Sequence, residues 1–169
     1  MKKTYRIALS GILLALACTL SYIESIVPLP LPLGAKPGLA GIVVMFAFMK
    51  IDFPSAATIT VLKSAFVLLT RGFTASIMSA SGGILSLAVM LMLFRFTKSS
   101  TVMISVCGAV THNIGQIIAA GLIMGSLSSA ATYSPILIIA GCLTGSLTGF
   151  LLSLILKSCR VPLKTHLIK

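Results

Sequence analysis

The chain has 169 residues, of which 57% are hydrophobic and only 9% are charged, and its mean hydropathy is +1.13. Soluble domains carry about 25% charged residues, so this composition excludes an ordinary soluble domain. The net charge of +11 could suit a nucleic-acid-binding protein. The basic residues, however, interrupt apolar runs and are not clustered on a polar face with aromatic side chains. We therefore expect an integral membrane protein that binds no nucleic acid.

Residues 1–169 are predicted to form one all-α transmembrane domain of about six helices. A helix of about 20 apolar residues crosses the hydrocarbon core of a bilayer. In chain order the predicted helices cover residues 5–27, 39–49, 55–70, 75–94, 101–124 and 134–156. The first apolar run is longer than that of a typical signal peptide, which favours an uncleaved helix.

Two connections interrupt the predicted helices in distinct ways. The proline-rich segment 28–34 follows the first helix, and its alternating prolines forbid a helix there. The short second helix is either tilted or extended by re-entry of this segment into the membrane. An uncharged loop, 125–133, separates the fifth and sixth helices.

The distribution of basic residues predicts the orientation. With six helices and both termini in the cytoplasm, ten bases lie on the cytoplasmic side: Lys2, Lys3, Arg6, Lys50, Arg95, Lys98, Lys157, Arg160, Lys164 and Lys169. The positive-inside rule favours this arrangement, and a five-helix alternative would place the basic C-terminal tail outside. Three bases do not fit the pattern: Lys36, Lys63 and Arg71.

These three bases and several polar residues are predicted to meet in the outer half of the membrane. At about 1.5 Å rise per residue, Lys63 lies about 12 Å into its helix, and Glu24, Arg71 and Lys36 lie near the outer surface. The predicted helix 101–124 carries His112, Asn113 and Gln116 about 16 to 22 Å from its cytoplasmic end, and His112 and Gln116 share a face. On the helix 75–94, Ser81 lies beside Gly82 and Gly83, which predict a weak point where backbone donors are exposed to a ligand.

Charged groups inside a membrane usually mark a substrate or ion path. The predicted cavity is net positive and should bind an anionic or phosphate-bearing ligand that enters from outside. Alternatives remain for single residues. Lys63 could snorkel to the surface, Arg71 could anchor the interface, and Glu24 could only pair with a base. His112, Asn113 and Gln116 could form hydrogen bonds between helices.

Small residues recur at every fourth position in two helices. They are Gly141, Gly145 and Gly149 in the last helix, and Gly11 and Ala15, then Ala17 and Ser21, in the first. Such rows permit close helix contact. They predict either packing within the bundle or, for one row, a surface for a partner subunit. The four cysteines have no metal-ligand spacing, so we expect no metal or cofactor.

Four stretches of the chain resemble the Gx transporter family, which is also labelled heptaprenyl diphosphate synthase component I. They are residues 21–24, the proline-rich run 28–34, residues 36–40 and residues 108–116, of which His-Asn-Ile-Gly-Gln at 112–116 is the most specific part. The resemblance covers nearly the whole chain and implies a multi-pass protein of the bacterial cytoplasmic membrane. The chain departs from the family pattern at Gly41, where the family has Asn, so any contribution of that Asn to ligand binding is missing.

The family is in turn similar to the substrate-binding subunits of energy-coupling factor transporters, which capture vitamins or their precursors. This similarity implies that Gly11, Ala15, Ala17 and Ser21 dock on a transmembrane coupling subunit that works with two ATPases. The chain itself has no Walker A motif and cannot hydrolyse ATP alone.

The synthase label conflicts with the acid content of the chain. Prenyl elongation needs Mg²⁺ held by clustered carboxylates, and the chain has only Glu24 and Asp52, predicted on opposite sides of the membrane. We expect no enzyme activity. The leading hypothesis is a transporter subunit that binds a small anionic, isoprenoid-related or vitamin-related solute. The alternatives are a non-catalytic accessory subunit of polyprenyl diphosphate or quinone synthesis, and a structural partner of a membrane redox complex.

Overall fold

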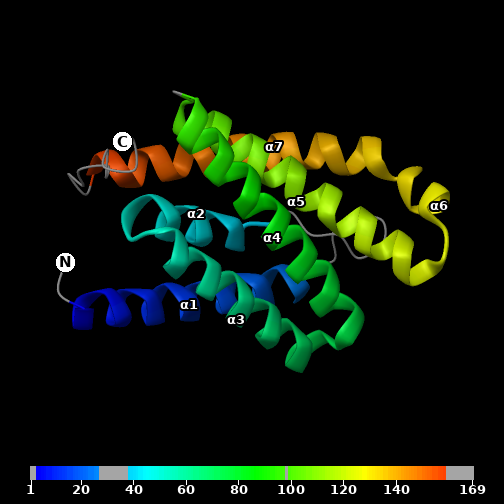
Figure 1. The fold of residues 1–169 in the computed structure, drawn as a ribbon, viewed down its shortest axis with the longest axis horizontal. Coiled ribbons are helices and arrows are strands. Elements are labelled where there is room, and N and C mark those ends of the chain that lie inside the picture. The colour runs from blue at the N-terminus through cyan, green and yellow to red at the C-terminus, as the bar shows by residue number, and fades with distance from the viewer. Residues whose placement is uncertain (1–2, 27–37, 98, 159–169) are drawn as a thin grey trace.

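The computed structural model describes residues 3–26, 38–97 and 99–158, and the regular structure in these ranges is entirely helical (Figure 1). The helices are α1 (Lys3–Ile26), α2 (Ala40–Lys50), α3 (Phe53–Arg71), α4 (Phe73–Phe96), α5 (Thr101–Met124), α6 (Leu127–Ala131) and α7 (Ser134–Ser158). The predicted all-α fold is confirmed, and each predicted helix boundary agrees within two residues. The difference is α6, a short helix inside the predicted loop. The proline-rich segment and Lys36 lie outside the described residues.

Within the described residues, five helices are long and apolar enough to cross a membrane: α1, α3, α4, α5 and α7. With 11 residues, α2 is only about 16 Å long, roughly half the hydrocarbon core. Large apolar side chains are exposed on the outside of the bundle, and Leu69, for example, is 85% exposed. The chain is therefore a multi-pass membrane protein. The predicted six spans correspond to five long helices and one half-length helix.

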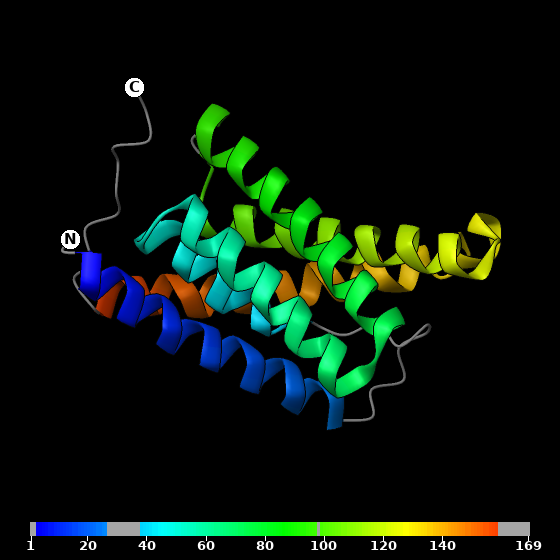
Figure 2. The same cartoon turned by 60° about the horizontal axis from the view of Figure 1, so that its bottom comes forward.

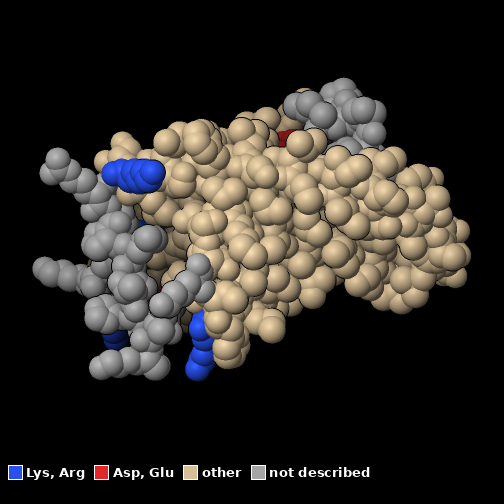
Figure 3. Space-filling view, turned by 90° about the horizontal axis from the view of Figure 1, so that it is seen from above, with Lys and Arg blue, Asp and Glu red and all other residues tan. Residues whose placement is uncertain are grey.

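Basic residues gather at one end of the bundle, which we call the basic end. It contains the start of α1 and the ends of α2, α4 and α7, and therefore Lys3, Arg6, Lys50, Arg95 and Lys157 (Figure 1). Figure 3 shows Lys and Arg only at this end on the face in view. The positive-inside rule predicts that the basic end is cytoplasmic.

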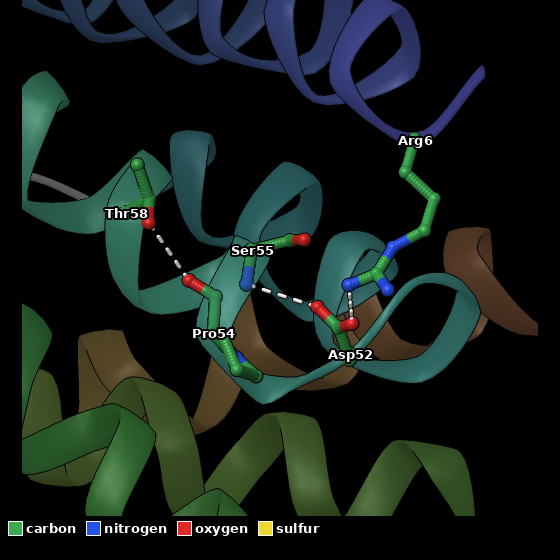
Figure 4. A network of polar contacts seen from close by, with 5 residues as sticks. All are labelled: Arg6, Asp52, Pro54, Ser55 and Thr58. Carbon is green, nitrogen blue, oxygen red and sulfur yellow. Dashed lines mark hydrogen bonds and ion pairs between the residues drawn. The ribbon is translucent and has the colours of Figure 1, made fainter. Parts of the chain in front are cut away.

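The turn between α2 and α3 is fixed by Asp52 at the basic end. Its Oδ1 accepts a hydrogen bond from the Ser55 backbone N–H at 3.0 Å and so caps α3, while its Oδ2 pairs with the Arg6 guanidinium of α1 (Figure 4). Pro54 occupies the first turn of α3, where its missing N–H costs nothing. The ion pair also ties α1 to this turn.

The half-length α2 forms the centre of the bundle. It is packed against α1, α3, α5 and α7, and Figure 2 shows it enclosed by its neighbours. Most of its apolar side chains are buried, and Phe48 contacts the rings of Phe53 and Phe94 edge-on at centroid distances of 6.5 and 5.4 Å. These contacts close the core toward the basic end.

Glycines allow α7 to contact the backbone of α5. A Cβ atom at Gly145 would lie 2.6 Å from Val106 Cα, and one at Gly149 would lie 2.8 Å from Val102 Cα, so neither position has room for a side chain. Gly141 packs in the same way against Val110. The interpretation of this row as packing within the bundle is confirmed.

The glycine pair of α4 does not interrupt the helix, which continues from Phe73 to Phe96. A Cβ atom at Gly82 would lie 2.6 Å from the His112 carbonyl oxygen, and one at Gly83 would lie 2.5 Å from Thr60 Cγ2. The predicted weak point with exposed donors is therefore wrong, because the glycines serve close packing against α5 and α3.

The two small-residue pairs of α1 point in different directions. Ala17 and Ser21 are buried at 0% and 7% exposure and lie on the face of α1 that packs inside the bundle. Gly11 and Ala15 are exposed on the outer face. Only the latter pair is accessible to a partner in this structure.

Candidate ligand-binding cavity

A cavity of about 240 Å³ lies inside the bundle, next to the N-terminal end of α2. Helices α1 to α5 and α7 contribute to its wall. Most of its polar lining residues are buried: Ser21, Glu24, Thr60, Lys63, Ser79, Ser86, Ser105, Gln116 and Thr148. His112 is half-buried and Arg71 is exposed.

Five residues predicted from the sequence line this cavity together: Glu24, Lys63, Arg71, His112 and Gln116. Glu24 comes from α1, Lys63 and Arg71 come from α3, and His112 and Gln116 come from α5. The predicted convergence of these side chains is therefore seen in the structure.

Two other predicted residues, Asn113 and Ser81, make hydrogen bonds between helices outside the cavity. Asn113 is buried and its Nδ2 donates to the Leu137 carbonyl of α7 at 2.7 Å, while the Ser81 hydroxyl donates to the Gly115 carbonyl of α5 at 3.1 Å. Neither lines the cavity. Both side chains connect helices, which is the alternative that the sequence left open for Asn113.

One face of α3 supplies both cations among the described lining residues of the cavity. Lys63, Val67 and Arg71 are spaced by four residues and therefore share a helix face. Arg71 is exposed, as is Thr74, and together they mark the mouth at the end of the bundle opposite the basic end. Lys63 lies about 12 Å deeper along the helix. It is only 6% exposed and makes no hydrogen bond or ion pair with any residue that the structure describes.

Glu24 joins the cavity to the start of α2. Its carboxylate is 7% exposed and its Oε1 accepts a hydrogen bond at 3.3 Å from the backbone N–H of Ala40, the first residue of α2. A negative charge is favourable at this end of a helix. Glu24 also interacts electrostatically with Lys63 and Arg71. Two cations and one carboxylate leave one net positive charge among the described lining residues.

His112 and Gln116 lie one turn apart on the face of α5 that lines the cavity. Their Nε2 atoms are 3.1 Å apart and form a hydrogen bond. The His112 ring also packs against Gly82 of α4. Gln116 Oε1 is buried and has no hydrogen-bond partner among the described residues.

Sequence reasoning missed the hydroxyl groups of the deeper part of the cavity. Thr60, Ser86, Ser105 and Thr148 line it, and Ser105 and Thr148 hydrogen-bond each other across α5 and α7 at 3.0 Å. Hydroxyls in apolar helices often bond to a carbonyl of their own helix, so a lone Ser or Thr carries little signal. For Thr60, the spacing of three residues from Lys63 was an available indication.

The two acidic residues lie at opposite ends of α2. Glu24 contacts its first residue and Asp52 follows its last, about 16 Å away. This separation prevents the two carboxylates from sharing one Mg²⁺ ion. Within the described ranges no three His, Cys, Asp or Glu side chains come together, and Cys18, Cys107 and Cys142 are free thiols.

These features define a helical multi-pass membrane protein whose internal cavity has a mixed polar and apolar lining and a net positive charge among the described lining residues. The chain belongs to the heptaprenyl diphosphate synthase component I family, because the sequence model of that family matches residues 13–155. The matched region contains the whole described lining of the cavity, and the family resemblance seen in the sequence is confirmed. No curated protein and no solved structure matches the chain.

Proposed function

We propose that this protein is the substrate-binding subunit of a membrane transporter and captures a small anionic solute in the internal cavity. The observation that carries the proposal is the state of Lys63, which is buried in a membrane-spanning helix, lines the cavity and has no ion pair or hydrogen bond with a described residue. A buried charge of this kind is expensive, and within a membrane it usually serves a ligand or ion.

The volume of the cavity supports a small solute. Its volume of about 240 Å³ is slightly below the ~300–1,000 Å³ of pockets that hold drug-sized ligands. A polyprenyl chain of seven isoprene units is far too large for this space. This cavity therefore cannot hold the full heptaprenyl chain that the family description names.

The position of the mouth supports uptake from outside. Arg71 and Thr74 lie at the end of the bundle opposite the basic end, which the positive-inside rule places in the cytoplasm. An exposed arginine at the entrance attracts anions before they reach Lys63. On the similarity to energy-coupling factor transporters, the exposed Gly11 and Ala15 of α1 are the docking positions for a transmembrane coupling subunit that works with ATPases.

A second function is favoured by the family description itself: a non-catalytic membrane subunit in heptaprenyl diphosphate or quinone synthesis. The separation of Glu24 and Asp52 argues against Mg²⁺-dependent prenyl transfer by this chain, so this role would support an enzyme without performing the reaction. The cavity would then bind a short precursor or remain unused.

One pair of measurements separates the two functions. Purified protein in detergent is screened by thermal shift against small phosphates, carboxylates, vitamins and isoprenoid phosphates. A strain that lacks the gene is then tested for uptake of each hit and for its polyprenyl products. Reduced uptake of a hit with unchanged polyprenyl chains supports the transporter. Altered polyprenyl chains with normal uptake support the accessory role and contradict the transporter.

A further inference from the structure

Gln116 Oε1 on α5 is a fully buried side-chain atom without a hydrogen-bond partner in the described part of the chain. Three further polar side chains line the cavity and make no hydrogen bond with a described residue: Ser21 of α1, Lys63 of α3 and Ser86 of α4. The exposures of Gln116, Ser21, Lys63 and Ser86 are 7%, 7%, 6% and 7%, so each is more than nine-tenths buried. Buried polar groups are normally paired, and each exception asks for an explanation.

Other hydroxyls that line the same cavity are paired. Thr60 donates to the Ala56 carbonyl at 2.9 Å, Ser79 accepts from Ser64 at 3.4 Å, and Ser105 bonds to Thr148. Pairing is thus available to hydroxyls in this bundle. The unpaired set is a feature of four positions on four helices that surround one space.

The unpaired amide atom of Gln116 is an acceptor. Gln116 Nε2 and His112 Nε2 form a hydrogen bond. An amide nitrogen can only donate, so the ring nitrogen accepts in this bond. Oε1 remains, and only an O–H or N–H group can satisfy it.

The lining of the cavity extends over several turns of two helices. Its lining on α3 extends from Thr60 to Arg71 and on α5 from Ser105 to Gln116, which is about 16 Å along each helix.

We propose that the ligand is an anion that carries hydroxyl or amino groups along its length, and that anions with a purely hydrocarbon tail are rejected. This inference rests on the proposed function and narrows its ligand class. Lys63 receives the acidic group, Gln116 Oε1 accepts from a ligand donor, and the Ser86 and Ser21 hydroxyls can donate or accept. A hydrocarbon tail would displace water from these groups and leave them unpaired, which is the costly outcome for a buried polar site.

Matched probe pairs test the inference by equilibrium binding to the purified full-length protein. Glycerol 3-phosphate is compared with propyl phosphate, and 4-hydroxybutyrate with pentanoate, so each pair shares an acid and differs in hydroxyl content. We expect the hydroxylated member of at least one pair to bind about tenfold more tightly than its partner. Ser86→Ala should reduce this preference without weakening the hydrocarbon member. Ser146→Ala, at an exposed serine of α7, is the matched control and should change neither.

The outcomes distinguish the inference from the proposed function. Equal binding within both pairs, lost in Lys63→Met, overturns the inference and leaves the proposed function standing. Tighter binding of the hydrocarbon members also overturns the inference. A preference for hydroxyls that survives both Ser86→Ala and Gln116→Leu overturns the assignment to these residues. If no anion of the pairs or of the wider screen binds in a Lys63-dependent manner, the proposed function fails and the inference fails with it.

Discussion

Replacement of Lys63 by methionine should have opposite effects on stability and on ligand binding. Methionine has a similar length and an apolar character that suits the interior of the bundle. In the free protein, the substitution removes the charge of a residue that is only 6% exposed. This charge has no ion pair or hydrogen bond with a described residue. We therefore expect Lys63→Met to stabilise the free protein or leave its stability unchanged.

The magnitudes follow from the burial of the ammonium group. The effective desolvation penalty of a buried ion is several kcal/mol, and the interaction with Glu24 offsets part of it. A gain of about 1 kcal/mol would raise the melting temperature by about 2–4 °C for a chain of this size. For the bound anion, loss of a hydrogen bond to a charged group costs about 1.5–3 kcal/mol, or roughly 10–150-fold in affinity.

Thermal unfolding in detergent, with and without the anion that gives the largest shift, measures both effects on one sample. Lys157→Met, at an exposed lysine of the basic end, is the matched control and should leave both the melting temperature and the shift unchanged. A Lys63→Met protein that melts several degrees lower and still shows the full ligand-induced shift would refute the assignment of Lys63 to the ligand. It would show instead that Lys63 has a structural role.

Three further substitutions test the packing. Asn113→Ala should lower the free energy of unfolding by about 1–3 kcal/mol, because it leaves the buried Leu137 carbonyl unpaired, while anion affinity in the folded fraction stays unchanged. Gly145→Ala should destabilise the bundle in the same thermal assay, because its Cβ would collide with the α5 backbone, whereas Gly11→Ala, with nothing within 4 Å, should not. Asp52→Ala should lose about 0.5–2 kcal/mol with the α3 cap, and Asp52→Asn, which keeps a cap, should lose less.

Much of the fold could be predicted from the sequence because membrane helices follow simple length and hydropathy rules. The boundaries of all six predicted helices were recovered within two residues, including the unusual shortness of α2. The short helix α6 was missed because five residues capped by Ser126 do not show a helical period.

The candidate site was predictable only in part. Charges inside apolar runs are conspicuous, so Glu24, Lys63 and Arg71 could be placed by depth alone. The direction of a side chain around its helix axis is harder to predict when apolar residues surround it. Asn113 therefore could not be separated from His112 in advance, although it faces α7 and not the cavity. The paired glycines of α4 were misread for the same reason, because their close contacts with α3 and α5 leave no trace in the sequence.

The most direct test of the central claim is protection of a cysteine placed in the cavity. In a variant without native cysteines, Ser79→Cys places a thiol in the lining, and Lys157→Cys places one at the basic end. A membrane-impermeant thiol reagent added from outside intact cells should label Ser79→Cys, and a saturating bound anion should prevent this labelling. The same reagent should label Lys157→Cys only from the cytoplasmic side. Labelling of Ser79→Cys that comes only from the cytoplasmic side, or that a bound anion does not slow, would contradict an outward-facing anion site in this cavity.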